Sequence, residues 1–192
     1  MRVHAHIALA LLLVLGAAIR LPAETRALER LTFARPSAPE STVDPKDRLP
    51  LTVERWSTDA ERDQVLRAIA ENGDRQVLDG LRDVARIGTL WWPGGLEYDV
   101  RYARTEPRAD GSTDVVLLLD RPLWVWWDAK AASTTYPYTV VQLRLGKDGR
   151  GEGRTSLDNA VVTDPKLGVM LKDYASAAVR LSDVRREKLP VT

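Results

Sequence analysis

Apolar residues after position 57 first recur at helical spacing and later alternate with polar ones. Thr58-Asp59-Ala60-Glu61 can form a capping box, in which Thr58 caps the first helical turn and Glu61 bonds back to it. Asn72-Gly73 then ends the pattern with residues that tolerate a left-handed backbone. Asp74 can cap a second short helix. Its apolar face is predicted to hold Val77, Leu78, Leu81 and Val84.

Beyond residue 87 the pattern is typical of β-strands. Leu96 to Tyr102 alternates apolar and polar positions, which predicts a strand with one solvated face. Val115 to Leu119 is apolar throughout, which predicts a strand covered on both faces. Asp110-Gly111 and Asp148-Gly149 are typical of hairpin turns. Further strands are predicted over residues 138–145, 154–162, 169–171 and 179–184.

This order predicts an α+β fold. A short helical pair comes first, and about six strands linked mainly by hairpins follow. Strands joined by hairpins pair antiparallel, so we expect a mainly antiparallel β-sheet or sandwich with the helices to one side. No alternation of strand and helix supports a parallel sheet.

Residues 1–23 have the pattern of a secretion signal. Arg2 precedes an unbroken run of apolar residues and glycine from Ile7 to Ala18, and small residues follow. The run is shorter than the roughly 20 residues that cross a bilayer. We therefore expect a signal peptide cleaved after Ala18 or Ala23, and an exported protein in a periplasm or outside the cell.

The composition of residues 24–50 predicts a flexible tether. Proline recurs among Ser, Thr and charged residues, and Phe33 is the only aromatic residue. Such a segment has little apolar surface to offset the entropy lost on ordering. Residues 51–192 are then expected to form a single globular domain.

The charge balance excludes some partners. The chain has 28 Lys and Arg against 27 Asp and Glu, and without Arg2 and Arg20 the counts are 26 and 27, a net charge of −1. This balance offers no basic surface for nucleic acid and no polybasic patch for a membrane. No later apolar stretch approaches spanning length, so no integral membrane segment is expected after signal cleavage.

Several kinds of catalytic site are excluded by composition. The chain has no cysteine, and its two histidines, His4 and His6, lie within the predicted signal. The mature chain therefore cannot build a Ser-His-Asp triad, a thiol protease site or a Cys/His zinc site. The glycines from Gly146 to Gly153 do not have the spacing of a phosphate-binding G-x-x-x-x-G-K-[ST] loop. Their pattern is better explained by a hairpin loop. No cofactor and no metal is predicted.

Carboxylates remain as acid-base candidates. Asp120 and Asp128 flank a tryptophan-rich segment and are the best pair for a hydrolase that needs two facing carboxyl groups. Glu97 and Asp99 share a strand face with Arg101, which is typical of a solvated row of charges.

The tryptophan-rich segment is the most distinctive cluster. Extended backbone would place Trp124 and Trp126 on one face and Trp127 on the other. Such residues most often pack in a core, but exposed rings can also form a ligand platform or anchor at a membrane interface. For the ligand platform, the predicted binding residues are Trp124, Trp126, Trp127, Asp128, Lys130 and Tyr136.

Two segments near the end of the chain, Leu171–Ala175 and Val179–Arg185, resemble a family of exported bacterial proteins of uncharacterised function. The resemblance covers about Leu51 to Arg186. It implies a bacterial envelope protein, with no activity and no functional residue to carry over.

The leading hypothesis is a non-enzymatic exported domain that binds a small molecule or an envelope protein through its sheet and its tryptophan-bearing loop. Trp126 would supply apolar contact, and Asp128 or Lys130 would orient the ligand. One alternative is a carboxylate-dependent hydrolase acting on cell-wall or extracellular polysaccharide. Another is a structural or assembly protein of the envelope.

Overall fold

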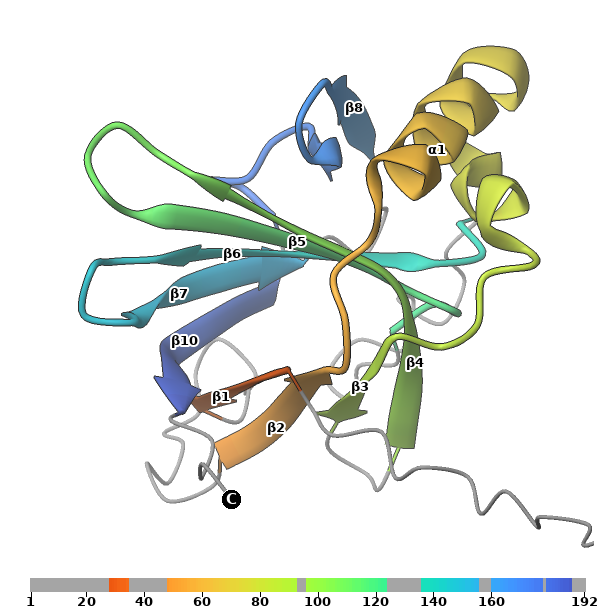
Figure 1. The fold of residues 1–192 in the computed structure, drawn as a ribbon. Helices are drawn as coiled ribbons and strands as arrows, with labels where there is room; N and C mark the ends of the chain where they lie inside the picture. The colour runs from red at the N-terminus through yellow and green to blue at the C-terminus, as the bar shows by residue number, and fades with distance from the viewer. Residues whose placement is uncertain are drawn as a thin grey trace, which may run out of the picture.

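The computed structural model describes residues 28–34, 48–92, 96–123, 136–155, 160–177 and 179–187, and its fold is a closed antiparallel β-barrel (Figure 1). Eight strands form the barrel, in the order β1-β10-β7-β6-β5-β4-β3-β2. They are β1 (Glu29–Ala34), β2 (Arg48–Val53), β3 (Gly88–Trp92), β4 (Leu96–Pro107), β5 (Thr113–Leu119), β6 (Thr139–Leu145), β7 (Arg150–Thr155) and β10 (Val179–Glu187). Because β1 pairs with both β2 and β10, the sheet has no free edge.

The predicted α+β fold is therefore wrong. The chain forms an eight-stranded barrel rather than a helical pair followed by an open six-stranded sheet or sandwich. Hairpin signals predicted the antiparallel pairing correctly. They could not predict closure, because the closing pair joins residues as distant in sequence as Arg30 and Glu187.

Part of the predicted tether is also strand. β1 and the start of β2 lie within residues 24–50, so the tether is wrong at residues 29–34 and 48–50. Leu31 and Phe33 are fully buried there, and the Phe33 ring lies 6.4 Å from the Trp92 ring. Long-range packing supplies the apolar contact that the segment lacks locally.

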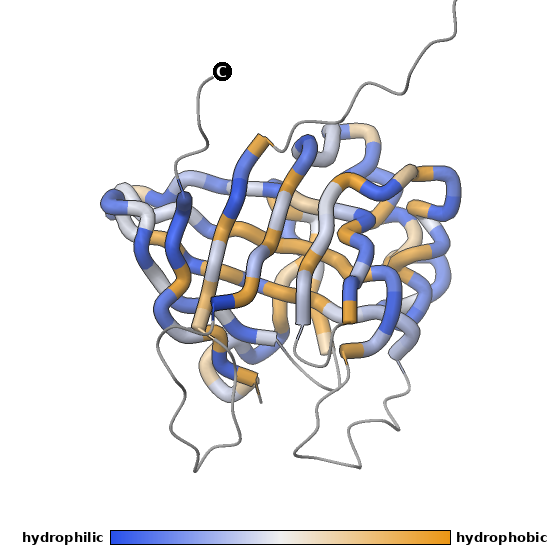
Figure 2. The backbone as a smooth tube through the Cα atoms, turned by 90° about the horizontal axis from the view of Figure 1, so that it is seen from below, coloured by the Kyte–Doolittle hydropathy of each residue, from blue (hydrophilic) through white to orange (hydrophobic). Residues whose placement is uncertain are grey.

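Apolar side chains fill the interior of the barrel. Hydrophobic positions alternate with hydrophilic ones along the strands, which follows from the two-residue period of extended backbone (Figure 2). The fully buried members of this cluster include Leu31, Phe33, Val53, Leu90, Val100, Leu117, Leu143, Leu181 and Val184.

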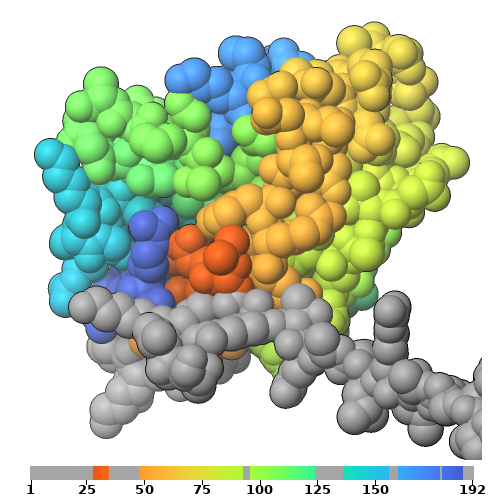
Figure 3. All heavy atoms as spheres, viewed as in Figure 1, coloured from red at the N-terminus to blue at the C-terminus, as the bar shows by residue number. Residues whose placement is uncertain are grey.

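A second apolar cluster covers one outer side of the barrel. Helices α1 (Asp59–Asn72) and η1 (Asp74–Leu81) and the hairpin β8 (Val161–Asp164)–β9 (Gly168–Leu171) pack over strands β4, β5 and β6. The hairpin lies between α1 and the β4–β5 hairpin (Figure 3). Strand β5 is thus buried on both faces, which confirms the prediction from its apolar run. The single strand predicted over residues 154–162 is wrong, since β7 ends at Thr155 and β8 begins a separate hairpin.

Helix α1 begins and ends as predicted. The Thr58 side chain accepts a hydrogen bond from the Glu61 N–H at 3.2 Å, and Glu61 accepts one from the Thr58 N–H at 2.8 Å. Gly73 follows the helix at φ +82° and donates to the Ile69 carbonyl at 2.9 Å. The hydrogen-bonded Arg55 guanidinium holds the pKa of the Glu61 carboxyl below its usual range. The capping box is confirmed.

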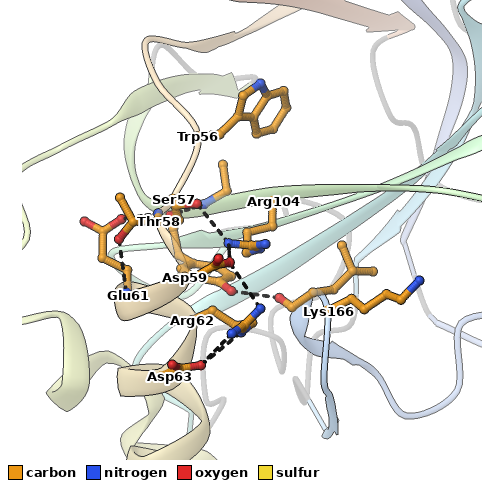
Figure 4. Close-up of polar contacts among 12 residues, drawn as sticks. Trp56, Ser57, Thr58, Asp59, Glu61, Arg62, Asp63, Arg104 and Lys166 are labelled. Atoms are coloured by element: carbon orange, nitrogen blue, oxygen red, sulfur yellow. Dashed lines mark hydrogen bonds and ion pairs between the residues drawn. The ribbon is translucent and has the colours of Figure 1, made fainter.

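Polar contacts fix the start of α1 to β4 (Figure 4). Ser57 donates to the Ala103 carbonyl at 2.8 Å, and its hydroxyl accepts from the Ala103 N–H at 3.1 Å. Arg104 donates to the Ser57 carbonyl and pairs with Asp59, both at 3.1 Å.

The second predicted helix differs from its prediction. η1 is a 3-10 helix with non-helical backbone at Gln76, and no side chain caps it. The Asp74 carboxylate, expected to be the cap, accepts a hydrogen bond from the Tyr136 hydroxyl instead. Among the described residues, neither helix has the length and apolar character needed to cross a membrane.

Candidate functional site

A β-bulge in β4 redirects Arg101. Val100 pairs with Leu119 and Tyr102 with Leu118, so Arg101 is an extra residue with no partner on β5. The bulge reverses the inward and outward faces of the strand: Val100 packs inside the barrel, whereas Tyr102 packs in the outer cluster. The unbroken alternation predicted from Leu96 to Tyr102 is therefore wrong at Tyr102, whose hydroxyl donates to the Leu167 carbonyl at 2.9 Å.

Arg101 lines a pocket of about 370 Å³ between η1 and the barrel. Helix η1 and the residue after it form one wall, and the β4 bulge and the end of β5 form the other. The lining residues are Leu78, Asp79, Leu81, Arg82, Arg101 and Asp120. The pocket thus combines two leucines with two carboxylates and two guanidinium groups. Charged residues therefore outnumber apolar ones, whereas most small-molecule sites have a mainly apolar lining with a few polar groups, so this pocket suits a small charged ligand better than an apolar one.

Three of the four charged groups in the pocket have partners. Asp79 accepts from Arg82 at 3.0 Å. The Asp120 Oδ1 atom accepts from the Asp99 N–H at 3.1 Å, and its Oδ2 atom lies 3.7 Å from an Arg121 nitrogen. Arg101 makes no hydrogen bond or ion pair within the described part of the chain. Its guanidinium is therefore free to bind a ligand, and Asp120 Oδ2 can still accept a hydrogen bond.

Asp120 is the predicted catalytic candidate that lies in this pocket. Its proposed partner, Asp128, is outside the described residues, as are Trp124, Trp126, Trp127 and Lys130 of the predicted ligand platform.

Tyr136, the remaining predicted binding residue, lies against the start of η1. Its hydroxyl donates to Asp74 at 2.9 Å, its ring meets the Tyr138 ring edge-on, and the Arg75 guanidinium lies 5.5 Å from its ring centre. Burial raises the pKa of the neighbouring Tyr138 phenol, which donates to the Asp74 carbonyl. Asp120 and Tyr136, which flank the tryptophan-rich segment in sequence, therefore both lie beside η1.

Glu97 and Asp99 lie beside a different arginine from the one predicted. Arg86 lies 3.7 Å from Glu97 and 3.9 Å from Asp99, whereas Arg101 was expected to share their face. Sequence reasoning therefore missed Arg101 as a pocket residue, together with Asp79 and Arg82. No sequence signal marks the bulge, because an aromatic residue such as Tyr102 suits either face of a covered strand.

Comparisons with protein-family models, curated proteins and solved structures find no match for this chain.

Proposed function

We propose that this protein is an exported, non-enzymatic binding domain whose pocket between η1 and β4 binds a small molecule with an anionic group. One observation carries the proposal: Arg101 lines a pocket of about 370 Å³ and has no polar partner among the described residues. A guanidinium in that position is a directional donor for a carboxylate or phosphate group.

The other lining residues complement such a ligand. Leu78 and Leu81 provide apolar contact for the uncharged part of the molecule. Asp120, anchored to β4 through Oδ1, orients the ligand by accepting a hydrogen bond at Oδ2.

The test is a thermal-shift screen with small carboxylates, phosphate monoesters and neutral sugars as separate panels. An anionic compound that binds the pocket should raise the melting temperature of the wild type, because ligand bound only by the folded state stabilises it. Arg101→Gln should abolish that rise and leave the melting temperature without ligand nearly unchanged, since the side chain has no partner to lose.

Arg67→Gln is the matched control, since Arg67 is an exposed arginine on α1 away from the pocket. It should keep the full ligand response. The proposal is wrong if anionic compounds stabilise Arg101→Gln as strongly as the wild type.

Export is supported by the sequence pattern of residues 1–23. The expected result is a mature N-terminus at position 19 or 24, determined by mass spectrometry of the protein from its native cell. An intact Met1 on the accumulated protein would contradict export by a cleaved signal.

A carboxylate-dependent hydrolase is the second candidate, and it is favoured by the presence of Asp79 and Asp120 in one pocket. Each aspartate already has a basic partner, which fits ligand orientation better than proton transfer. Release of reducing ends from cell-wall polysaccharide, lost in Asp120→Asn, would support the hydrolase over the binder.

A further inference from the structure

Three buried polar atoms on the outer side of β6 and β7 have no hydrogen-bond partner. They are Gln142 Nε2, Arg154 Nε and Tyr174 Oη. Each can donate a hydrogen bond. Buried donors are rarely left unpaired, because each unpaired group loses its hydration without replacement. A fourth such atom, Thr155 Oγ1, is on the neighbouring residue and so belongs to the opposite face of β7.

The three donors belong to one small area. Gln142 and Arg154 are direct partners across the β6–β7 pair, so their side chains leave the sheet on the same side. Tyr174 lies over this side, because the Arg144 guanidinium, two residues along β6 from Gln142, is 5.5 Å from its ring centre. Gln142 is 1% exposed, and its Oε1 accepts from the Leu171 N–H at 3.1 Å. That bond fixes which end of the amide is the donor.

The charges nearby favour an anion as the missing partner. Asp114 is shared by Arg108 and Arg144, and Glu152 is paired with Arg180 at 3.0 Å. Arg154 has no ion pair within the described residues, so its positive charge is not compensated there. Burial raises the pKa of the Tyr174 phenol, which keeps its proton available for donation.

We propose that this area, which we call the β6–β7 donor cluster (Gln142, Arg154 and Tyr174), binds a small oxyanion. One oxygen-bearing group, a phosphate or a carboxylate, would accept hydrogen bonds from the three donors and compensate the charge of Arg154. Charge-assisted bonds of this kind are the strong ones. The cluster shares no residue with the pocket between η1 and β4, so the inference goes beyond the proposed function.

The test measures melting temperature while sodium phosphate, or in a second series sodium acetate, replaces sodium chloride at constant ionic strength. The wild type should show a saturable rise with phosphate, with acetate, or with both, and the stronger series identifies the class of oxyanion. Gln142→Glu is the decisive variant. It keeps the acceptor for Leu171 but replaces the donor with a carboxylate facing Arg154. It should be insensitive to both anions.

Tyr174→Phe is the milder variant, because it removes one hydroxyl and keeps the ring beside Arg144. It should weaken anion binding roughly tenfold, the effect of losing one hydrogen bond to a charged group. This variant keeps the test decisive if Gln142→Glu fails to fold.

Arg101→Gln separates the two sites, since it removes the free donor of the pocket and leaves the donor cluster intact. It should retain the full response to phosphate or acetate. The inference is overturned if neither anion gives a saturable rise in the wild type, in which case buried water satisfies the donors. It is also overturned if the response survives in both Gln142→Glu and Tyr174→Phe.

Discussion

Two glycines on barrel strands lie where the neighbouring backbone leaves no room for a side chain. A Cβ atom on Gly151 would lie 1.8 Å from the Arg144 carbonyl oxygen, and one on Gly88 would lie 2.2 Å from the Thr52 carbonyl oxygen. Both contacts are with backbone atoms, which cannot rotate away as a side chain can. Glycine normally weakens a strand, but here it allows β7 and β3 to approach their neighbours closely.

Gly151→Ala should therefore destabilise the barrel by about 2–3 kcal/mol, the cost of forcing strands apart to admit a methyl group. Gly146→Ala is the control, because its Cβ would lie 3.1 Å from the movable Asp148 carboxylate and 3.4 Å from the Arg150 carbonyl oxygen, which is ordinary van der Waals contact. Urea unfolding of the two variants measures the difference. Equal midpoints would show that β7 can shift away from β6 without loss.

Arg101 illustrates why the candidate site was only partly predictable. Asp120 could be proposed from its place beside the tryptophans, since that judgement needs only sequence proximity. Arg101 could not, because its role depends on a bulge that leaves the apolar alternation of Tyr98, Val100 and Tyr102 intact in the sequence. Tyr102, which the bulge turns outward, belongs to the outer cluster with Val77 and Leu81 of η1, and contacts between such distant residues have no local signal in the sequence.

At the scale of elements, one buried carboxylate links the β4–β5 turn to β6. Asp114 has only 4% of its side chain exposed, and it accepts from Arg108 at 2.5 Å and from Arg144 at 2.9 Å. The hydrogen bond to Asp114, together with the charge of that carboxylate, raises the pKa of the Arg144 guanidinium. Two cations from different elements thus depend on a single anion.

Asp114→Asn should destabilise the protein by about 1–3 kcal/mol, because a hydrogen bond to a charged group is replaced by a weaker neutral one at each arginine. The half-exposed arginines can regain some hydration, which keeps the loss below that of a fully buried pair. Asp83→Asn, at an exposed aspartate with no ion pair in the described chain, should be neutral. Chemical unfolding at neutral pH compares them. A neutral Asp114→Asn would show that the network contributes no net stability.

Elements defined by local signals were predicted well. The capping box of α1 and the apolar run of β5 each lie within a few consecutive residues. The local sequence is therefore enough to predict where the helix starts and that the strand is covered on both faces. Strand β1 was missed because only Leu31, Phe33 and Ala34 mark it as apolar, among prolines and charges. Its stability comes from β2 and β10, and the pairing with β10 has no local signal.

At the scale of the molecule, closure of the barrel explains why the pocket is on one outer side. The interior is filled by strand side chains, so helices and the β8–β9 hairpin can add contacts only outside, over β4, β5 and β6. The space between η1 and the β4 bulge is where that outer layer meets the barrel incompletely. None of the residues that line this space belongs to the interior cluster, so the pocket can change without disturbing the packing inside the barrel.

Because β1 closes the barrel, we expect the stability of the fold to depend on it. The variant Phe33→Ala tests this expectation. Phe33 is fully buried beside Trp92, whereas a residue of a flexible tether would have no core contact to lose. Truncating a buried phenylalanine costs roughly 3–5 kcal/mol, a large share of the about 5–15 kcal/mol that stabilises a domain. Leu28→Ala, at a side chain 55% exposed just before β1, should cost much less. Denaturant unfolding measures both. If Phe33→Ala unfolds at the same midpoint as the wild type, β1 does not close the barrel in solution and the tether prediction is restored.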